Sequence, residues 1–332
     1  MVGMVVVVLI CKYSHFFPIC ANETGKITIV RRELFLLSKG SEIFRNFAKT
    51  YLLSLLTDMK KDDKYLKQYM KEHLRECQLK QLGILEVIDG ICRKHGIDYW
   101  LEGGTLLGAV RHGGFIPWDD DIDIAMKQAD LRRFCQVAPD ELPEDLFLQN
   151  RQTDPGSKEG GITKVRCLNS IYIEEGDHFI GDYCKGVFVD IFPYVDYPDV
   201  SRKFMKKLSR GVDVSHSVLD HLHYYSFRSV AEFFWFGMKN LFWRAVFAVL
   251  MLFRNNKKYI ASTLETNGYG CMHLRDDLFP TQDIEFEGKM FKAARVPDTY
   301  LREQYGDYMQ IPPVEKRMIH GIFIMPQLVD EE

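Results

Sequence analysis

The sequence of 332 residues predicts an α/β (α+β) fold, in which a sheet is flanked by helices and a hydrophobic helical insert interrupts the chain. Three observations support this prediction. Apolar residues recur at helical spacing over 63–95, short apolar runs then alternate with helical patterns, and a long apolar stretch lies within 200–265. A hydrophobic content of 46% over this length is sufficient for a full core.

The chain divides into two parts. Residues 1–60 are predicted to be an extension of unclear role, and residues 61–332 form the folded domain. Residues 1–11 are apolar, but they lack a basic start and are too few to span a bilayer. They indicate a poorly defined leader, with a signal peptide as the alternative. An amphipathic helical pattern follows over 28–60.

The domain is predicted to begin with a helix over about 63–95, which Gly96 ends. Strands and helices then alternate, with a strand at 98–102, a short helix at 105–110, a strand at 121–126, a helix at 128–138, and strands near 146–149, 162–174 and 186–192. Toward the C-terminus the pattern predicts a hairpin over 284–293 and a helix over 297–306.

Acidic residues crowd the strand predicted at 121–126. Because side chains alternate along a strand, Asp119, Asp121 and Asp123 point one way and the apolar side chains point the other. Two ionised carboxylates about 4 Å apart repel by roughly 4 kcal/mol at an effective dielectric near 20, so this row requires a cation or a shared proton. Oxygen ligands without a nearby His or Cys favour Mg²⁺ or Mn²⁺.

Two other interpretations of the acidic residues were weighed. A merely solvated acidic loop is disfavoured, because the acids lead directly into the apolar sequence Ile-Asp-Ile-Ala-Met. An EF-hand calcium loop matches the spacing of the aspartates, but its sharp turn requires Gly where this chain has Ile124. The run is therefore predicted to be a strand with a metal site.

A glycine turn and a second acidic strand complete the pattern. Gly103, Gly104 and Thr105 follow an apolar strand, and glycines allow a phosphate to approach backbone N–H groups closely. The spacing matches neither a dinucleotide fingerprint nor a P-loop. Asp190 interrupts a run that otherwise predicts a buried strand over 186–192, so it needs a partner. The alternative is an Asp that accepts backbone hydrogen bonds at a strand end.

These motifs together resemble the LicD family, a branch of the nucleotidyltransferase fold that includes fukutin and fukutin-related protein. The resemblance rests on GGTLLGAVRHGGFIPWDDDIDIAM over 103–126, VDIFP over 189–193 and YGDYMQIPP over 305–313. It runs from about Leu74 to the C-terminus. It implies a mixed sheet flanked by helices, and transfer of phosphocholine or an alditol phosphate from a CDP-linked donor to a sugar hydroxyl.

The resemblance also implies roles for the acids. Asp121 and Asp123 match the metal-binding pair, Asp119 is a further ligand, and Asp190 matches the third acid of the fold. Asp190 then either shares a second ion or accepts the proton of the acceptor hydroxyl. His320 matches a histidine near the C-terminal end of the family, although a lone His is more often structural.

Basic residues are needed to contact the phosphate, which carries negative charge on its oxygens. The candidates are Arg111 and His112, between the glycine turn and the acidic strand, and Lys164 and Arg166, two apart and hence on one strand face. The alternative for each is a solvated surface charge.

The insert contains a helical stretch over 229–253 whose charges are Glu232, Lys239 and Arg244. Basic clusters precede and follow it. This pattern is typical of a helix on an anionic membrane surface. A helix buried in the fold or in a dimer is the main alternative, and the interior charges disfavour a true span.

Composition limits the remaining function classes. The chain has 43 basic and 46 acidic residues, so its charge implies no nucleic-acid partner. Its 8 cysteines show no CxxC spacing, which indicates a reducing cytosol and no structural zinc. We therefore expect a cytoplasmic protein, peripheral on the inner face of the membrane, and the resemblance implies that it is an enzyme that acts on a glycan or lipid-linked glycan. Nucleotidyl transfer and a non-catalytic binding protein on the same fold are the alternatives.

Overall fold

The computed structural model describes residues 20–21, 27–28, 64–157, 162–174, 183–220, 226–253, 257–317 and 319–327. The leader predicted over 1–11 lies outside the described residues. Of the amphipathic segment predicted over 28–60, only Thr28 is described. At the N-terminal end, strands β1 (Cys20–Ala21) and β2 (Ile27–Thr28) form a short antiparallel pair.

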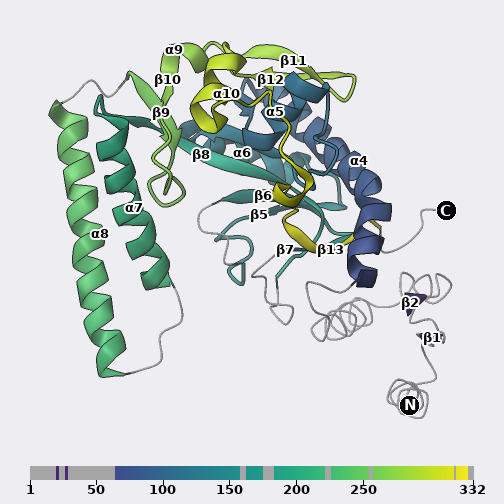
Figure 1. Cartoon of the computed structure of the whole chain (residues 1–332), viewed down its shortest axis with the longest axis horizontal. Coiled ribbons are helices and arrows are strands. Elements are labelled where there is room, and N and C mark those ends of the chain that lie inside the picture. The colour runs from purple at the N-terminus through teal and green to yellow at the C-terminus, as the bar shows by residue number, and fades with distance from the viewer. Residues whose placement is uncertain are drawn as a thin grey trace.

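The helix predicted over 63–95 is confirmed as α4 (Lys64–His95). Its apolar positions recur at helical spacing, and Leu85, Ile88 and Cys92 are buried on the side that faces the rest of the domain. Gly96 follows with a φ of +59°, a left-handed conformation that favours glycine and ends the helix. Figure 1 shows α4 along one side of the domain.

Seven strands form the central sheet: β3 (Tyr99–Leu101), β4 (Asp123–Lys127), β5 (Leu146–Gln149), β6 (Thr163–Cys167), β8 (Phe188–Tyr197), β9 (Tyr259–Ser262) and β10 (His273–Leu274). The central strand β8 pairs in parallel with β4 along one edge. Along its other edge, β6 and then β9 pair with it antiparallel. The sheet is therefore mixed, and the predicted α/β class is confirmed.

Two strand predictions need correction. The strand predicted over 162–174 is two strands, because β6 belongs to the central sheet whereas β7 (Ile171–Glu174) pairs with β13 (Gly321–Met325) in a separate sheet. The strand predicted over 121–126 begins only at Asp123, because its partner β3 ends at Leu101 and the chain there turns into a helix.

The remaining helices and turns cover the sheet. They are α5 (Gly103–His112), α6 (Gln128–Glu141), α9 (Arg275–Leu278), α10 (Pro297–Tyr305) and the 3-10 turn η1 (Val314–Lys316). Strands β11 (Gln282–Phe286) and β12 (Lys289–Ala293) form the predicted hairpin, with Glu287 and Gly288 at positive φ in its turn. The predicted end of α10 at Gly306 is also confirmed.

The insert forms a helical hairpin, α7 (Arg202–Asp220) and α8 (Phe227–Phe253), that stands beside the sheet (Figure 1). A small apolar cluster that includes Met205 and Leu208 of α7 joins it to the sheet through Tyr197 and Ala261. No residue of α8 is buried. The alternative of a helix buried in the fold is therefore wrong, because α8 packs on its neighbours along one side only.

Candidate active site

The centre of the candidate site is a pair of aspartates on neighbouring parallel strands. Asp123 of β4 lies opposite Asp190 of β8 in the register of the two strands, so both carboxylates leave the sheet on the same face. Burial, together with the negative charges of Asp121 and Asp190, raises the pKa of Asp123 well above its ordinary value. Ionised together, these groups need a cation.

The other predicted ligands precede the strand. Asp119 and Asp121 lie in the turn that leads into β4, where the N–H of Asp119 donates to the carbonyl of Ile116 at 2.9 Å. The expectation that three aspartates alternate along one strand is therefore wrong. Burial and the negative charges of Asp121 and Asp120 raise the pKa of Asp119 to about 8. The apolar residues expected on the opposite face, Ile122, Ile124 and Met126, are buried.

The glycine turn faces these carboxylates. A Cβ at Gly103 would lie 3.5 Å from Asp123 Oδ2, and a Cβ at Gly104 would lie 2.9 Å from Asp119 Oδ2. Gly103 also has a φ of +52°. The hydroxyl of Thr105 accepts a hydrogen bond from the backbone N–H of Asp123 at 2.8 Å and so fixes the start of β4. The N-terminus of α5, with its positive partial charge, is thereby held against the acids.

Asp120 has a role that the sequence did not reveal. Its carboxylate is buried and accepts hydrogen bonds from the Tyr172 hydroxyl at 2.8 Å and from the backbone N–H groups of His320 and Gly321 at 3.1 and 2.7 Å. Burial opposes its ionisation, but the hydrogen bonds outweigh burial and lower the pKa of Asp120. Asp120 thus attaches the start of β13 to the acidic turn.

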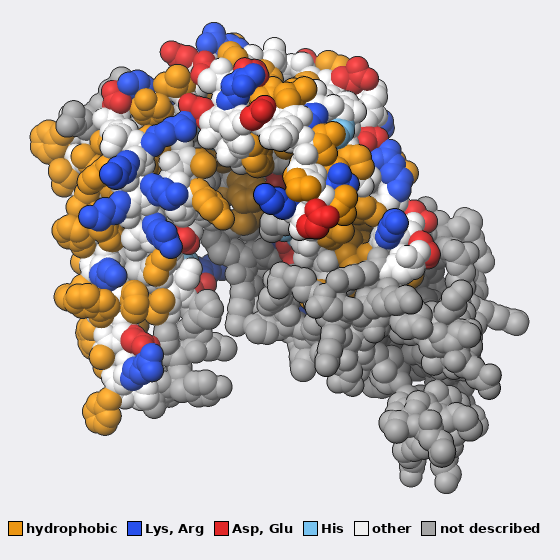
Figure 2. Space-filling model, in the orientation of Figure 1, with side chains coloured by type: hydrophobic (Ala, Val, Ile, Leu, Met, Phe, Trp, Pro, Cys, Tyr) orange, Lys and Arg blue, Asp and Glu red, His pale blue; other side chains and the backbone are white. Residues whose placement is uncertain are grey.

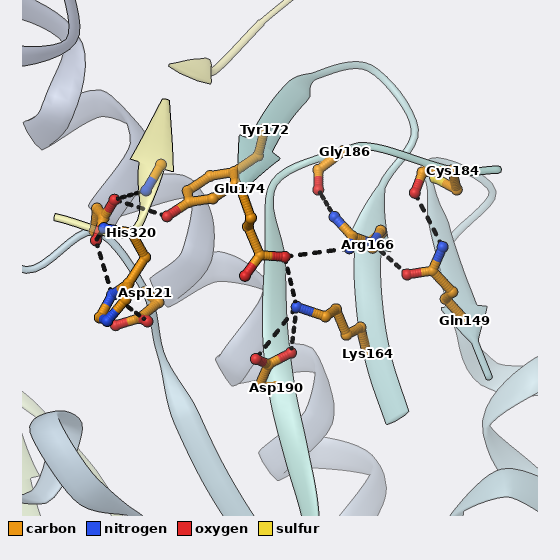
Figure 3. Close-up of polar contacts among 12 residues, drawn as sticks. Asp121, Gln149, Lys164, Arg166, Tyr172, Glu174, Cys184, Gly186, Asp190 and His320 are labelled. Carbon is orange, nitrogen blue, oxygen red and sulfur yellow. Dashed lines mark hydrogen bonds and ion pairs between the residues drawn. The ribbon is translucent and has the colours of Figure 1, made fainter. Parts of the chain in front are cut away.

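The same attachment brings His320 to the site. Its Nδ1 lies 3.1 Å from Asp121 Oδ2 (Figure 3), and hydrogen bonds to Asp120 and Asp121 raise the pKa of His320 to about 11. Ligand atoms of Asp120, Asp121 and His320 lie within 4.8 Å of one another, an arrangement able to hold a metal ion. Because Asp120 is already saturated by hydrogen bonds, Asp121 is the member with most freedom to bind a cation.

Lys164 and Arg166 lie two residues apart on β6, with Lys164 opposite Asp190 in the register with β8, and both are almost fully buried. Their interpretation as solvated surface charges is therefore wrong. Lys164 Nζ lies 3.1 Å from Asp190 Oδ1 and 2.9 Å from Glu174 Oε2. Asp190 thus pairs with the side chain of Lys164, the partner that its position in a buried strand required.

Arg166 lies one step further from the acids. It donates to the Gln149 side chain and to the carbonyl of Gly186 at 2.8 Å, and its Nη2 lies 3.8 Å from Glu174. Figure 3 shows the resulting row of paired groups, from Asp190 through Lys164 and Glu174 to Arg166. Arg166 thus supports Glu174, and Glu174 supports Lys164. A contact of either cation with phosphate stays a prediction.

Arg111 and His112 end α5 on the other side of the acids. Arg111 donates to the carbonyl of Tyr308 at 2.6 Å and to His112 Nε2 at 3.0 Å. Burial lowers the pKa of Arg111, while the negative charge of nearby Asp119 opposes that shift. The guanidinium of Arg317, which the sequence did not single out, lies 4.0 Å from the ring of Trp118, immediately before Asp119.

A buried network lies behind the glycine turn. Glu102, immediately before Gly103, accepts hydrogen bonds from the hydroxyls of Tyr194, at 2.8 Å, and Tyr300. The ring of His273 stacks on Tyr300 with centroids 3.7 Å apart. Periodicity could not reveal this network, because its members come from four separate elements and Glu102 alone adjoins a motif.

The arrangement combines a helix N-terminus with close-packed glycines, a group of carboxylates able to hold a divalent cation, and cations on either side. A diphosphate fits these surroundings, because its oxygens can bind both the backbone N–H groups and a metal ion. Neighbouring acids and a positioned cation are the groups that phosphoryl or nucleotidyl transfer requires.

Comparison with known proteins agrees with this chemistry. Residues 96–234 match the family described as LicD/FKTN/FKRP, nucleotidyltransferase domain. The lipopolysaccharide cholinephosphotransferase LicD of Haemophilus influenzae is 30% identical over 271 residues, which cover 75% of this chain and 96% of that protein. The human ribitol 5-phosphate transferase FKRP is 32% identical over 150 residues, which cover 45% of this chain and 23% of that protein.

Proposed function

The chain belongs to the LicD/FKTN/FKRP family and is a phosphotransferase of that family, and on this premise we propose its donor and its acceptor. The donor is CDP-linked, and the transferred group is phosphocholine or a similar phosphorylated substituent. The acceptor is a sugar hydroxyl of a cell-surface glycan, such as a lipopolysaccharide or teichoic acid precursor. The relative from Haemophilus influenzae, a lipopolysaccharide cholinephosphotransferase, supports this choice.

One observation carries the proposal. Asp123 and Asp190 lie side by side on parallel strands, and Asp123 packs against the backbone of the glycine turn at Gly103. A diphosphate bound beside this contact would receive N–H groups from the start of α5 and would share a metal ion with the acids. A side chain at Gly104 would collide with the Asp119 carboxylate, so glycine is what allows the turn and the acids to pack together.

The cofactor we propose is Mg²⁺ or Mn²⁺. Asp121 and Asp123 would hold it, with Asp119 and Asp190 as further ligands, because a set of carboxylate oxygens suits a hard divalent cation. The raised pKa values of Asp119 and Asp123 support this fit, since burial and, after it, the neighbouring negative charges disfavour the ionised carboxylates, and a bound cation would offset both effects. When bound, the ion neutralises negative charge on the diphosphate.

In the proposed step the acceptor oxygen attacks the phosphorus that carries the substituent, the bond from that phosphorus to the CMP oxygen breaks so that CMP leaves, and the hydroxyl proton passes to Asp190 or to solvent. Lys164 Nζ donates a hydrogen bond to Asp190 Oδ2 at 3.3 Å and lies at an ion-pair distance of 3.1 Å from Oδ1. A neighbouring ammonium favours the ionised carboxylate, which is the form that binds a cation. The ionised carboxylate of Asp190 suits either proposed role, that of a further metal ligand or that of the acceptor of the hydroxyl proton.

Purified protein incubated with Mn²⁺, a panel of CDP-linked donors and a glycan acceptor tests the proposal. We expect release of CMP with transfer of the substituent, and loss of at least a hundredfold in rate for Asp123→Asn. Asp140→Asn, an exposed carboxyl on α6, is the matched control and should retain the wild-type rate.

Three outcomes would contradict the proposal. Release of diphosphate from CTP, with the nucleoside monophosphate left on the acceptor, would identify nucleotidyl transfer instead. Full activity in EDTA would remove the metal from the mechanism. Binding of CDP-linked donors without turnover, under conditions in which the Asp140→Asn control is folded, would identify a binding protein.

A further inference from the structure

The hairpin of α7 and α8 has one side without a partner in the described part of the chain. Along α8 the side chains that face α7 include Trp243, Phe247 and Leu250. The opposite face carries only apolar residues, and all of them are exposed: Phe227, Val230, Ala231, Phe234, Met238, Leu241, Phe242, Ala245, Ala248, Val249 and Leu252. A helix of 27 residues is about 40 Å long, so this face is a continuous apolar strip.

Basic residues border this strip on one side. Lys207 and Arg210 of α7 and Lys239 of α8 line a groove of about 280 Å³ between the two helices, whose floor includes Gly211 and Trp243. Figure 2 shows the two features together, with hydrophobic side chains along the outer edge of α8 and Lys and Arg side chains in a column beside them. The groove thus offers positive charge next to an apolar surface.

This combination distinguishes a helix that lies on a membrane from one that crosses it. By length and composition α8 would be able to span a bilayer. However, α7 packs along it and exposes Lys203, Lys207 and Arg210, and a span would carry these charges into the hydrocarbon. With the strip inserted only to the depth of its side chains, the same cations lie at the level of the lipid phosphates.

We propose that the α7–α8 hairpin docks the protein on an anionic phospholipid membrane, with the apolar strip of α8 in the interfacial layer and the basic groove against lipid phosphate groups. A second copy of the chain could cover the apolar strip, but it would also bring two identical basic grooves together. The charge pattern therefore favours a negatively charged partner surface. If the proposed function is correct, docking places the active site beside lipid-linked acceptors; the docking itself does not depend on it.

Sedimentation of the full chain with vesicles tests the proposal. We expect binding to phosphatidylcholine vesicles that contain phosphatidylglycerol, and much weaker binding to phosphatidylcholine alone. The double variant Met238→Glu/Leu241→Glu should lose at least tenfold in partition coefficient. Leu79→Glu/Met290→Glu, on α4 and β12, is the matched control, because it adds the same two charges at side chains that are 50% and 53% exposed. It should bind as the wild type does.

A second pair of variants tests the groove. Lys207→Gln/Arg210→Gln should weaken binding to the anionic vesicles roughly 30-fold, since each cation near such a surface contributes about 1 kcal/mol. Lys71→Gln/Arg132→Gln removes the same two charges elsewhere and should have little effect. Thermal melts check that each variant is folded, and turnover of a soluble acceptor should be unchanged, which separates docking from catalysis.

Two results would overturn the docking proposal. One is vesicle binding that the Met238→Glu/Leu241→Glu variant retains in full. The other is a dimer in solution that does not bind vesicles and that this variant dissociates, which would identify the strip as an interface between two copies.

Discussion

Replacing Asp119 by Asn should stabilise the protein in the absence of divalent cations. Burial and the neighbouring carboxylates of Asp121 and Asp120 raise the pKa of Asp119 to about 8. Relative to an ordinary Asp, this difference of about 4 units corresponds to roughly 5 to 6 kcal/mol at about 1.4 kcal/mol per unit. Solvent reaches part of the side chain, and one substitution relieves only its share of the mutual repulsion. We therefore expect a gain of about 2 to 3 kcal/mol near pH 8.5.

The pH dependence has a defined sign. The folded protein binds the proton of Asp119 more tightly than the unfolded chain does, so its free energy of unfolding falls as the pH rises from about 4 to about 8. The Asn variant lacks this contribution, and its advantage over the wild type should therefore shrink as the pH is lowered through this range. Added Mn²⁺ should stabilise the wild type more than the variant.

Urea unfolding in EDTA at about pH 8.5 and about pH 5 measures both effects. Asp140→Asn removes an exposed carboxyl on α6 and should change stability by less than about 0.5 kcal/mol at either pH. If Asp119→Asn is no more stable than the wild type at the higher pH, or if the two proteins lose stability equally over this range, the argument from repulsion is refuted.

Three further predictions concern neighbouring groups. Lys164→Met leaves Asp190 and Glu174 without their shared cation and should cost about 3 to 5 kcal/mol in urea unfolding; a change below about 1 kcal/mol would contradict the burial argument. His320 should stay protonated near pH 8 in EDTA, because its pKa is raised to about 11, and a neutral imidazole in nitrogen NMR spectra would show that its pairing with Asp121 is wrong. Gly104→Ala should lower turnover by displacing the Asp119 carboxylate, whereas Gly83→Ala, in open space on α4, should retain turnover and stabilise by about 0.5 to 1 kcal/mol. Equal turnover in the two variants would exclude close packing as the reason for Gly104.

The fold could be predicted from the sequence where the pattern is local. The helix over 63–95, the hairpin at Glu287 and Gly288 and the helix from Pro297 all depend on periodicity or on turn residues within a few positions. The pairing of β7 with β13 could not be predicted, because its two strands are far apart in the sequence and neither carries a distinguishing pattern. Only the folded chain brings them together.

In the candidate site, too, local patterns could be predicted from the sequence and long-range contacts could not. The motifs identified Asp123 and Asp190, and the register of β4 and β8 places them side by side. They gave Asp120 no role, because the partners that hold it, Tyr172 and the start of β13, are far away in the sequence. Glu174 was missed as well. It matters because it pairs with Lys164 and Arg166 inside the fold, and the sequence did not show that these two cations are buried. Cations at alternate positions of a strand are equally compatible with an exposed face.

The three consecutive aspartates have a consequence for how this chain can change. Asp119 faces the glycine turn, Asp120 attaches β13, and Asp121 meets His320, so three identical residues perform three different tasks. Deleting any one of them leaves a sequence that still contains two adjacent aspartates. The sequence that results is the same whichever of the three is removed, and its two aspartates can fill at most two of the three positions between the turn at Ile116 and β4. Every single-codon deletion within this run should therefore have the same effect, the loss of at least one of the three tasks.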